Sequence, residues 1–116
     1  MRLFNGGIYL AKLNPAKKGE ISKVRPVAVV TTQVFLDDDP PIVFICPLSS
    51  RSTIAYDAWH LELPPRDKLQ RRSFALIEHC RAIASHRIIE PRIAQLLPEE
   101  RQEILLRLSY LTGMRA

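Results

Sequence analysis

The sequence of 116 residues predicts a mainly β fold that is closed by one C-terminal helix. Short apolar runs rich in β-branched residues recur along most of the chain, turn residues separate them, and a single stretch of helical period stands at the end. No alternation of strands with helices and no internal repeat is present. We therefore expect a small antiparallel barrel, or a strongly bent sheet, capped by the helix.

The predicted strands are short apolar runs with β-branched or alternating side chains, bounded by turn residues. They are residues 7–13, 26–32, 42–48, 59–63 and 73–83. Pro26 suits the first residue of its strand, where the missing N–H does least harm. Charged residues and Gly19 predict a loop at residues 16–24, and three aspartates with two prolines predict another at residues 37–41.

The C-terminal part of the chain predicts helical structure. Residues 85–89 favour a single helical turn that Glu90 and Pro91 end. Further on, Pro98 fits the first position of a helix, and Gly113 fits its end. One apolar stripe on this helix consists of Ile104, Leu105, Leu108 and Leu111. We expect this amphipathic helix to pack on the sheet.

Length and composition bound the class of protein. A chain of this length with 47% hydrophobic and 25% charged residues is typical of one globular domain. Asn5 and Gly6 interrupt the N-terminus before the core of a signal peptide could form, and no apolar run reaches the 18 or so residues that cross a bilayer. We expect a soluble cytoplasmic protein that does not contact the membrane.

The charge distribution points to polyanions as ligands. A net charge of +5 favours their approach and the release of their counterions. Basic side chains concentrate in two predicted loops, the first with Lys17, Lys18, Lys23 and Arg25 around Glu20, and the second with Arg66, Lys68, Arg71 and Arg72 around Asp67. The two loops form a basic groove if the fold brings them together; the alternative is two separate solvated loops.

Several kinds of site are not indicated by the sequence. Cys46 and Cys80 lack the paired spacing of a zinc site or a redox motif, and their apolar neighbours predict buried free thiols. The sequence contains no glycine-rich phosphate loop, no cluster of metal ligands at the usual spacing and no nucleophile elbow. We therefore expect neither a cofactor nor a metal ion.

Arg25 is a candidate for phosphate chemistry. The ring of Pro26 restricts Arg25 to an extended conformation, so its side chain leaves the sheet in a limited range of directions. A guanidinium held in this way can bind a phosphate through two parallel hydrogen bonds and stabilise charge that develops on it. The alternative is a structural role, in which Arg25 pairs with Glu20 and anchors its own loop.

Three further polar residues adjoin predicted strands. Ser49 follows a strand directly, and its hydroxyl can donate to a phosphoryl oxygen, although a serine in this place is also a common turn residue. Glu78 and His79 could form an acid–base pair. Adjacent residues of a strand point to opposite faces, however, so the same pattern argues against a shared substrate. His60 and His86 have no companion motif, and we assign them no function.

These segments resemble the MazF/PemK (Kid) family of toxin endoribonucleases from bacterial toxin–antitoxin pairs. The resemblance runs from about Gly6 to Gly113 and is carried, in order, by "GGIYLAKLNPAKKGEISKVRPVAVV", "VFICPLSS", "FALIEHCRAI" and "LPEERQEILLRLSYLTG". The spacing from Pro15 to Glu20 and on to Arg25 also agrees with the family pattern. Each segment alone is a weak signal, but four in the right order are specific.

The resemblance implies a fold, partners and a reaction. Residues 1–116 would form a single toxin domain, an SH3-like barrel of the CcdB/PemK type, which works as a homodimer and binds a cognate antitoxin. Such proteins cleave single-stranded RNA without a metal ion. The ribose 2′-hydroxyl attacks the adjacent phosphorus and leaves a 2′,3′-cyclic phosphate and a 5′-hydroxyl.

The resemblance also assigns residues. The family's catalytic arginine falls on Arg25, its serine or threonine on Ser49, an acidic residue near the RNA on Glu78, and a loop acid linked to RNA contact on Glu20. The expected catalytic residues are therefore Arg25, Ser49 and Glu78. The expected RNA-binding residues are Lys17, Lys18, Glu20, Lys23, Ser50, Arg51, His79 and Arg81.

Two positions depart from the family pattern. Gly7 stands where an aspartate is usual, and His79 stands where glutamine is common, so we hypothesise that His79 reads a base or transfers a proton. Residues 51–57 and 64–72 usually vary with the target, so no RNA sequence is assigned. Two other functions stay open: a CcdB-like poison of DNA gyrase, and a family member that binds RNA or an antitoxin without cutting.

Overall fold

The computed structural model describes residues 2–13 and 23–114, and in this part the protein is mainly β with a C-terminal helix, as predicted. The strands are β1 (Gly7–Lys12), β2 (Val24–Val29), β3 (Ile42–Ser49), β4 (His60–Leu63), β5 (Ser73–Leu76), β6 (Arg81–Ala84) and β7 (Ile88–Gln95). The α-helices are α1 (Gln33–Leu36) and α2 (Pro98–Leu111). Three 3₁₀ turns complete the fold: η1 (Ile54–Tyr56), η2 (Ile77–His79) and η3 (Ser85–Arg87).

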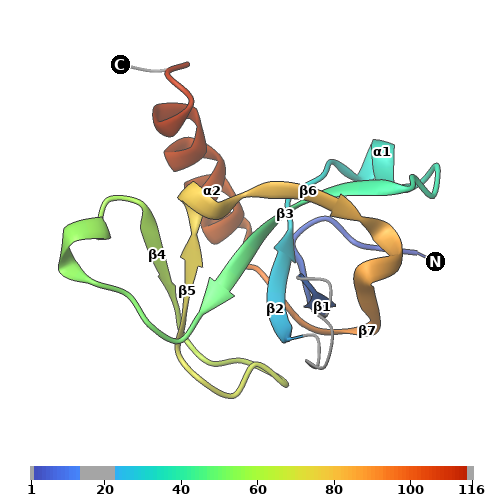
Figure 1. Cartoon of the computed structure of the whole chain (residues 1–116), viewed down its shortest axis with the longest axis horizontal. Coiled ribbons are helices and arrows are strands. Elements are labelled where there is room, and N and C mark those ends of the chain that lie inside the picture. Colours follow the sequence, from blue (N-terminus) through green and yellow to red (C-terminus); the bar gives the residue numbers. More distant parts are fainter. Residues whose placement is uncertain (1, 14–22, 115–116) are drawn as a thin grey trace, which may run out of the picture.

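The strands form one antiparallel sheet in the order β4-β5-β3-β2-β1-β7, and β6 pairs with β3 beside this path. The long strand β3 connects the different parts of this sheet. Its first part pairs with β6, and its last two residues, Leu48 and Ser49, pair with β5. In Figure 1 the β4–β5 pair therefore lies on one side of β3, and β1 and β7 lie on the other. The sheet bends at β3, whose residues 45–47 pair with β2 and whose last two residues pair with β5.

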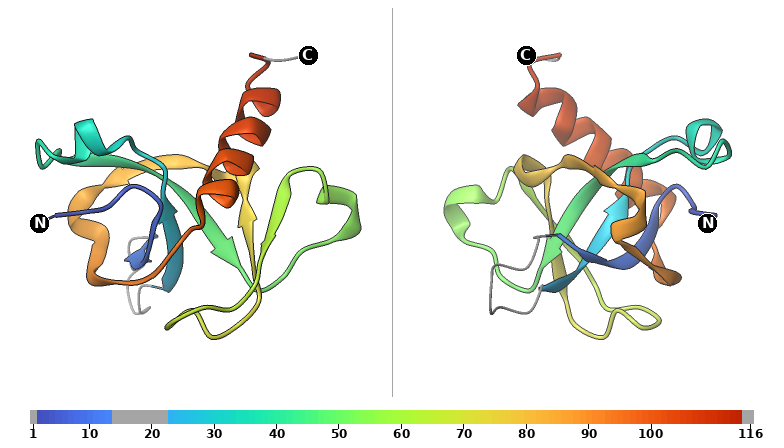
Figure 2. Two further views of the ribbon diagram at one scale, coloured as in Figure 1. Left: turned by 180° about the vertical axis from the view of Figure 1, so that it is seen from behind. Right: turned by 45° about the vertical axis from the view of Figure 1, so that its right-hand side comes forward.

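The sheet is buried on both faces near its centre. Successive residues of a strand point to opposite faces, and in β1 both Ile8 and Tyr9 are buried, in two different apolar clusters. The cluster around Ile8 also receives Ile104 of α2. Seen from behind, α2 lies across the sheet near β4 and β5 (Figure 2). One end of the sheet is thus closed by the helix.

The predicted C-terminal helix is confirmed, but its apolar stripe is only half buried. Ile104 is fully buried and Leu108 packs beside it, whereas Leu105 and Leu111 are exposed. The backbone N–H of Leu97 donates to the side chain of Glu100, which satisfies a free amide at the start of the helix. Among the described residues, no helix is long and apolar enough to cross a membrane.

Two boundaries of the predicted strands are wrong. Pro26 is the third residue of β2 rather than the first, which the sheet tolerates because the pairing of β2 with β3 begins only at Val27. The predicted strand at residues 73–83 is broken by η2, in which Ile77 is buried in the core. The chain can therefore leave β5, turn, and return to β3 as β6.

The sequence also left two elements unpredicted. The short helix α1 precedes the acidic loop at residues 37–41. The second unpredicted element is β7. The helical turn η3 is present as predicted, but β7 follows it directly and contains Pro91, which was expected to end the turn. β7 is an outer strand of the sheet and pairs only with β1 among the described strands, so a proline does little harm in it.

Candidate nucleic-acid site

Arg25 comes from β2 and Ser49 from β3. The antiparallel pairing of these strands ends at Val27 and Pro47, and Arg25 and Ser49 each lie two residues beyond this pair. Residues two apart in a strand lie on the same face, so both side chains leave the sheet on one side. Both residues line the same pocket, of about 520 Å³, which we call the Arg25 groove.

The Arg25 groove joins two basic segments that are far apart in the sequence. Lys23 comes from the approach to β2, and Lys68 and Arg71 come from the loop between β4 and β5. The rest of its polar lining consists of Ser49, Ser50, Gln70 and Ser73. The two basic loops thus meet through Lys23, Arg25, Lys68 and Arg71, as predicted, whereas Arg66 and Arg72 do not line the groove. Of the residues expected to bind RNA, Lys17, Lys18 and Glu20 lie outside the described residues.

A second pocket, of about 260 Å³, continues from Arg25 and Ser49 on the other side; we call it the His79 pocket. His79 and Arg81 line it together with Arg25. The guanidinium of Arg81 donates a hydrogen bond of 2.6 Å to the carbonyl oxygen of Leu13, so part of its hydrogen-bonding capacity holds the end of β1. Both His79 and Arg81 are exposed.

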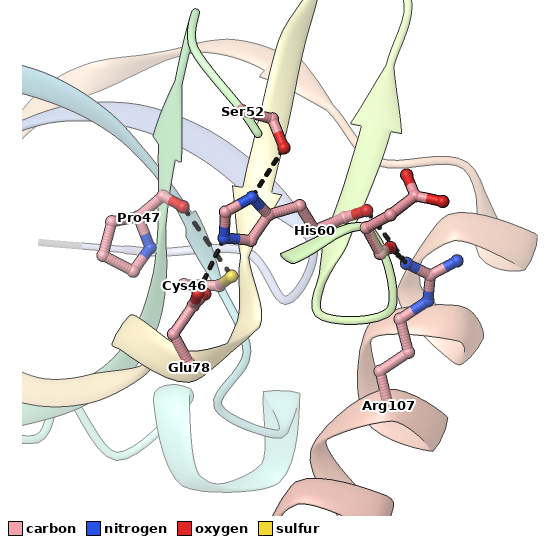
Figure 3. Close-up of polar contacts among 7 residues, drawn as sticks. Cys46, Pro47, Ser52, His60, Glu78 and Arg107 are labelled. Carbon is pink, nitrogen blue, oxygen red and sulfur yellow. Dashed lines mark hydrogen bonds and ion pairs between the residues drawn. The ribbon is translucent and has the colours of Figure 1, made fainter. Parts of the chain in front are cut away.

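Glu78 lies apart from Arg25 and Ser49. Its Oε2 atom is 2.7 Å from Nε2 of His60, and Nδ1 of His60 is 2.7 Å from the hydroxyl of Ser52 (Figure 3). These residues line a third pocket, of about 380 Å³, which we call the His60 pocket. His79 lines both this pocket and the His79 pocket, so the two are neighbours.

The geometry of η2 changes one inference from the sequence. The argument that Glu78 and His79 point to opposite faces assumed a strand, but the two residues lie in a 3₁₀ turn. Both accordingly line the His60 pocket. Of the other expected residues, Ser50 lines the Arg25 groove, and Arg51 lines the His60 pocket.

The structure adds residues that the sequence did not single out as a site. Lys68 and Arg71 were noted only as a basic loop, and His60 and Ser52 were given no role. What these four residues share in the sequence is that they are polar and lie at strand ends or in the loops between strands. Only the pairing of His60 with Leu76 in β4 and β5 brings His60 close to Glu78.

An ion pair anchors the loop between β4 and β5. The guanidinium of Arg66 binds both carboxylate oxygens of Glu100 at the start of α2, with Nη2 2.6 Å from Oε2. Burial raises the pKa of Glu100, but the hydrogen bonds from Arg66 and from the N–H of Leu97 outweigh this effect and hold the pKa below its usual value. The anchored loop is the one that carries Lys68 and Arg71 to the groove.

The two cysteines lie behind Glu78 as free thiols, as predicted, although only Cys46 is fully buried. A hydrogen bond with Cys80 and burial together raise the pKa of Cys46 far above its usual value, so Cys46 stays protonated. Within residues 2–13 and 23–114, no group of three or more His, Cys, Asp and Glu side chains is placed to hold a metal ion.

The arrangement suits a phosphodiester. The Arg25 groove offers a guanidinium, further cations and a hydroxyl on one wall, and pockets for flanking groups continue from it past His79. Arginine and lysine bind phosphate oxygens through charge-assisted hydrogen bonds. The described surface is thus chemically complementary to a polyanion.

Comparisons with known proteins identify the family and the fold of this chain. Residues 5–112 match the family model described as "PemK-like, MazF-like toxin of type II toxin-antitoxin system". The fold is similar to that of toxin MazF-mt6 of Mycobacterium tuberculosis, at 16% sequence identity and a TM-score of 0.76, over 95% of this chain and 99% of that one.

Two further solved structures share the fold. MazF of Deinococcus radiodurans is 19% identical with a TM-score of 0.78, over 98% of this chain and 99% of that chain. An endoribonuclease from a mycobacterial species, solved in complex with its cognate antitoxin, is 15% identical with a TM-score of 0.74, over 98% of each chain. At these identities the structural likeness shows the fold, and the family match shows the relationship.

Proposed function

The chain belongs to the family of PemK-like, MazF-like toxins of type II toxin–antitoxin systems, and on this premise we propose that it is a sequence-specific endoribonuclease for single-stranded RNA. The observation that carries the proposal is that Arg25 and Ser49 line one groove together with Lys23, Lys68 and Arg71. This arrangement supports phosphate binding and the stabilisation of charge on phosphorus.

In the proposed reaction the ribose 2′-hydroxyl attacks the adjacent phosphorus, and the bond to the 5′-oxygen breaks. The products are a 2′,3′-cyclic phosphate and a 5′-hydroxyl. Arg25 stabilises the negative charge on the phosphoryl oxygens. The backbone N–H of Arg51 already donates to Oγ of Ser49 at 3.1 Å, so the hydroxyl hydrogen of Ser49 is free to donate to a phosphoryl oxygen or to the leaving oxygen.

The proposal includes the partners of the protein and the limits of its domain. We take residues 1–116 as one toxin domain that acts as a homodimer and is inhibited by a cognate antitoxin. The solved complex of a mycobacterial endoribonuclease with its antitoxin supports the latter point by analogy of fold. Glu78 remains a proposed catalytic residue that acts from the neighbouring His60 pocket.

Incubation of the pure protein with a long single-stranded RNA in EDTA tests the proposed function. We expect discrete fragments with 5′-hydroxyl and 2′,3′-cyclic phosphate ends, because the scheme needs no metal ion. Enzymatic phosphorylation and sequencing of the fragment ends would identify the 5′-hydroxyl ends and the 2′,3′-cyclic phosphate ends. Intact RNA, together with trapped gyrase–DNA complexes in a parallel assay, would contradict the proposal and favour a gyrase poison of the same fold.

The exposed His79 tests whether a titratable side chain beside Arg25 takes part. We expect His79→Gln to lower the cleavage rate by roughly a hundredfold if the imidazole transfers a proton in the reaction, or to change the preferred sequence if it reads a base. The rate and the sequence of the cut sites are both measured on one RNA pool. Unchanged values of both would remove His79 from the mechanism.

A further inference from the structure

A line of three hydrogen-bonded side chains forms one wall of the His60 pocket. Oε2 of Glu78, the imidazole of His60 and the hydroxyl of Ser52 follow one another at 2.7 Å in each step (Figure 3). The side chain of His60 is only 9% exposed. Its backbone carbonyl accepts a hydrogen bond of 2.9 Å from Arg107 of α2, so the centre of the line is fixed from two sides.

Only one tautomer of a neutral His60 imidazole can form both hydrogen bonds, one with Glu78 and one with Ser52. An ionised carboxylate accepts hydrogen bonds and cannot donate them, so Nε2 of His60 carries the proton and donates to Glu78. Nδ1 is then an acceptor, and the hydroxyl of Ser52 must donate to it. The remaining capacity of the Ser52 oxygen is that of an acceptor. With the imidazole neutral, the network presents a hydrogen-bond acceptor, the Ser52 oxygen, to the pocket that Ser52 lines.

The rest of the pocket offers a donor and an aromatic wall. Arg51, the neighbour of Ser52, also lines the pocket, and an arginine side chain can only donate hydrogen bonds. Tyr56 stacks on His60 with ring centroids 5.6 Å apart and planes inclined by 14°. Single-stranded RNA is commonly recognised by stacking its bases on such rings and by hydrogen bonds to their edges. A pocket of about 380 Å³ lies within the range of small-ligand sites.

We propose that the His60 pocket binds one base of the RNA and selects adenine or cytosine. Both bases carry an exocyclic amino group, which donates, next to a ring nitrogen, which accepts, and this pair complements Ser52 and Arg51. Uracil and guanine place a carbonyl oxygen where the amino group would lie, and this oxygen would face the acceptor of Ser52. The inference rests on the proposed function, since it places the phosphate of the same strand at Arg25 and Ser49. In base binding, Glu78 and His60 act through Ser52, whose hydroxyl they orient.

The test uses hexaribonucleotides of adenine, cytosine or uracil with 2′-O-methyl groups, which cannot form the cyclic phosphate. Each is titrated into the ¹⁵N-labelled protein, and backbone amide shifts are followed by NMR. We expect shifts at residues 51–60 and 78–79, with adenine and cytosine hexamers binding about tenfold more tightly than the uracil hexamer. Ser52→Ala should bring this ratio close to one, and Ser52→Thr, which keeps the hydroxyl, should retain it.

Thr112→Ala serves as the matched control, because it removes an exposed hydroxyl from the end of α2 and should leave the ratio unchanged. Equal binding of all three hexamers, tighter binding of uracil, no shifts at the pocket, or an unchanged ratio in Ser52→Ala would each overturn the inference. Its failure is distinguishable from failure of the proposed function. RNA cleavage without base selection here refutes only the inference, and base selection without any RNA cleavage refutes only the ribonuclease.

Discussion

Arg25→Ala is expected to lower the rate of RNA cleavage by about a thousandfold, the order of effect seen when a preorganised cationic or oxyanion-stabilising group is removed. Arg25 is exposed and lines the groove together with Ser49, so its side chain is accessible to a phosphate bound there. Arg25→Lys keeps the charge but loses the planar pair of donors, and we expect an intermediate rate. Single-turnover cleavage of a defined RNA gives the rate for the wild type, Arg25→Ala and Arg25→Lys.

The matched control for this substitution is Arg101→Ala. Arg101 is also exposed, binds the side chain of Asn5 at 2.7 Å and lines none of the three pockets, so its loss should leave the cleavage rate unchanged. Arg25→Ala should also unfold at nearly the wild-type temperature, because an exposed side chain contributes little to stability. Cleavage by folded Arg25→Ala at the wild-type rate would refute the assignment of Arg25 as the catalytic cation.

The parts of the fold that the sequence predicts are those whose signals are local. β1, β3 and α2 each carry their own apolar pattern and end signals, and each lies close to its predicted place. The break at η2 could not be predicted, since it depends on Ile77 being drawn into a core built by other strands. β7 was missed because Pro91 is a strong stop signal whose cost is small only in an outer strand.

The same distinction applies to the site. The restricted direction of Arg25 follows from the neighbouring Pro26, but its place in one groove with Ser49 depends on the pairing of β2 with β3. The link from His60 to Glu78 spans 18 residues and requires both the pairing of β4 with β5 and the turn of η2. Residue types and strand ends thus indicate which side chains are available, while register decides which of them meet.

Arg66→Ala is expected to lower the free energy of unfolding by about 3 kcal/mol, as when one partner of a largely buried ion pair is removed. The side chains of Arg66 and Glu100 are 14% and 13% exposed, so the substitution leaves a poorly solvated carboxylate at the start of α2. Arg72→Ala, in the same loop, is the matched control. Its ion pair with Glu62 is 4.0 Å long and exposed, and its loss should cost less than about 0.5 kcal/mol.

The pH dependence identifies the pair as the cause. The folded-state pKa of Glu100 is lowered relative to its unfolded value of about 4.3, so its stabilisation is complete above that pH and is lost as the pH falls through the folded-state pKa. Urea unfolding of the wild type and of Arg66→Ala should therefore differ most at pH 7 and progressively less below about pH 4. A difference in unfolding free energy that stays constant from pH 7 to pH 3 would contradict this cause. It would show that the packing of the Arg66 side chain, rather than its charge, holds the loop on α2.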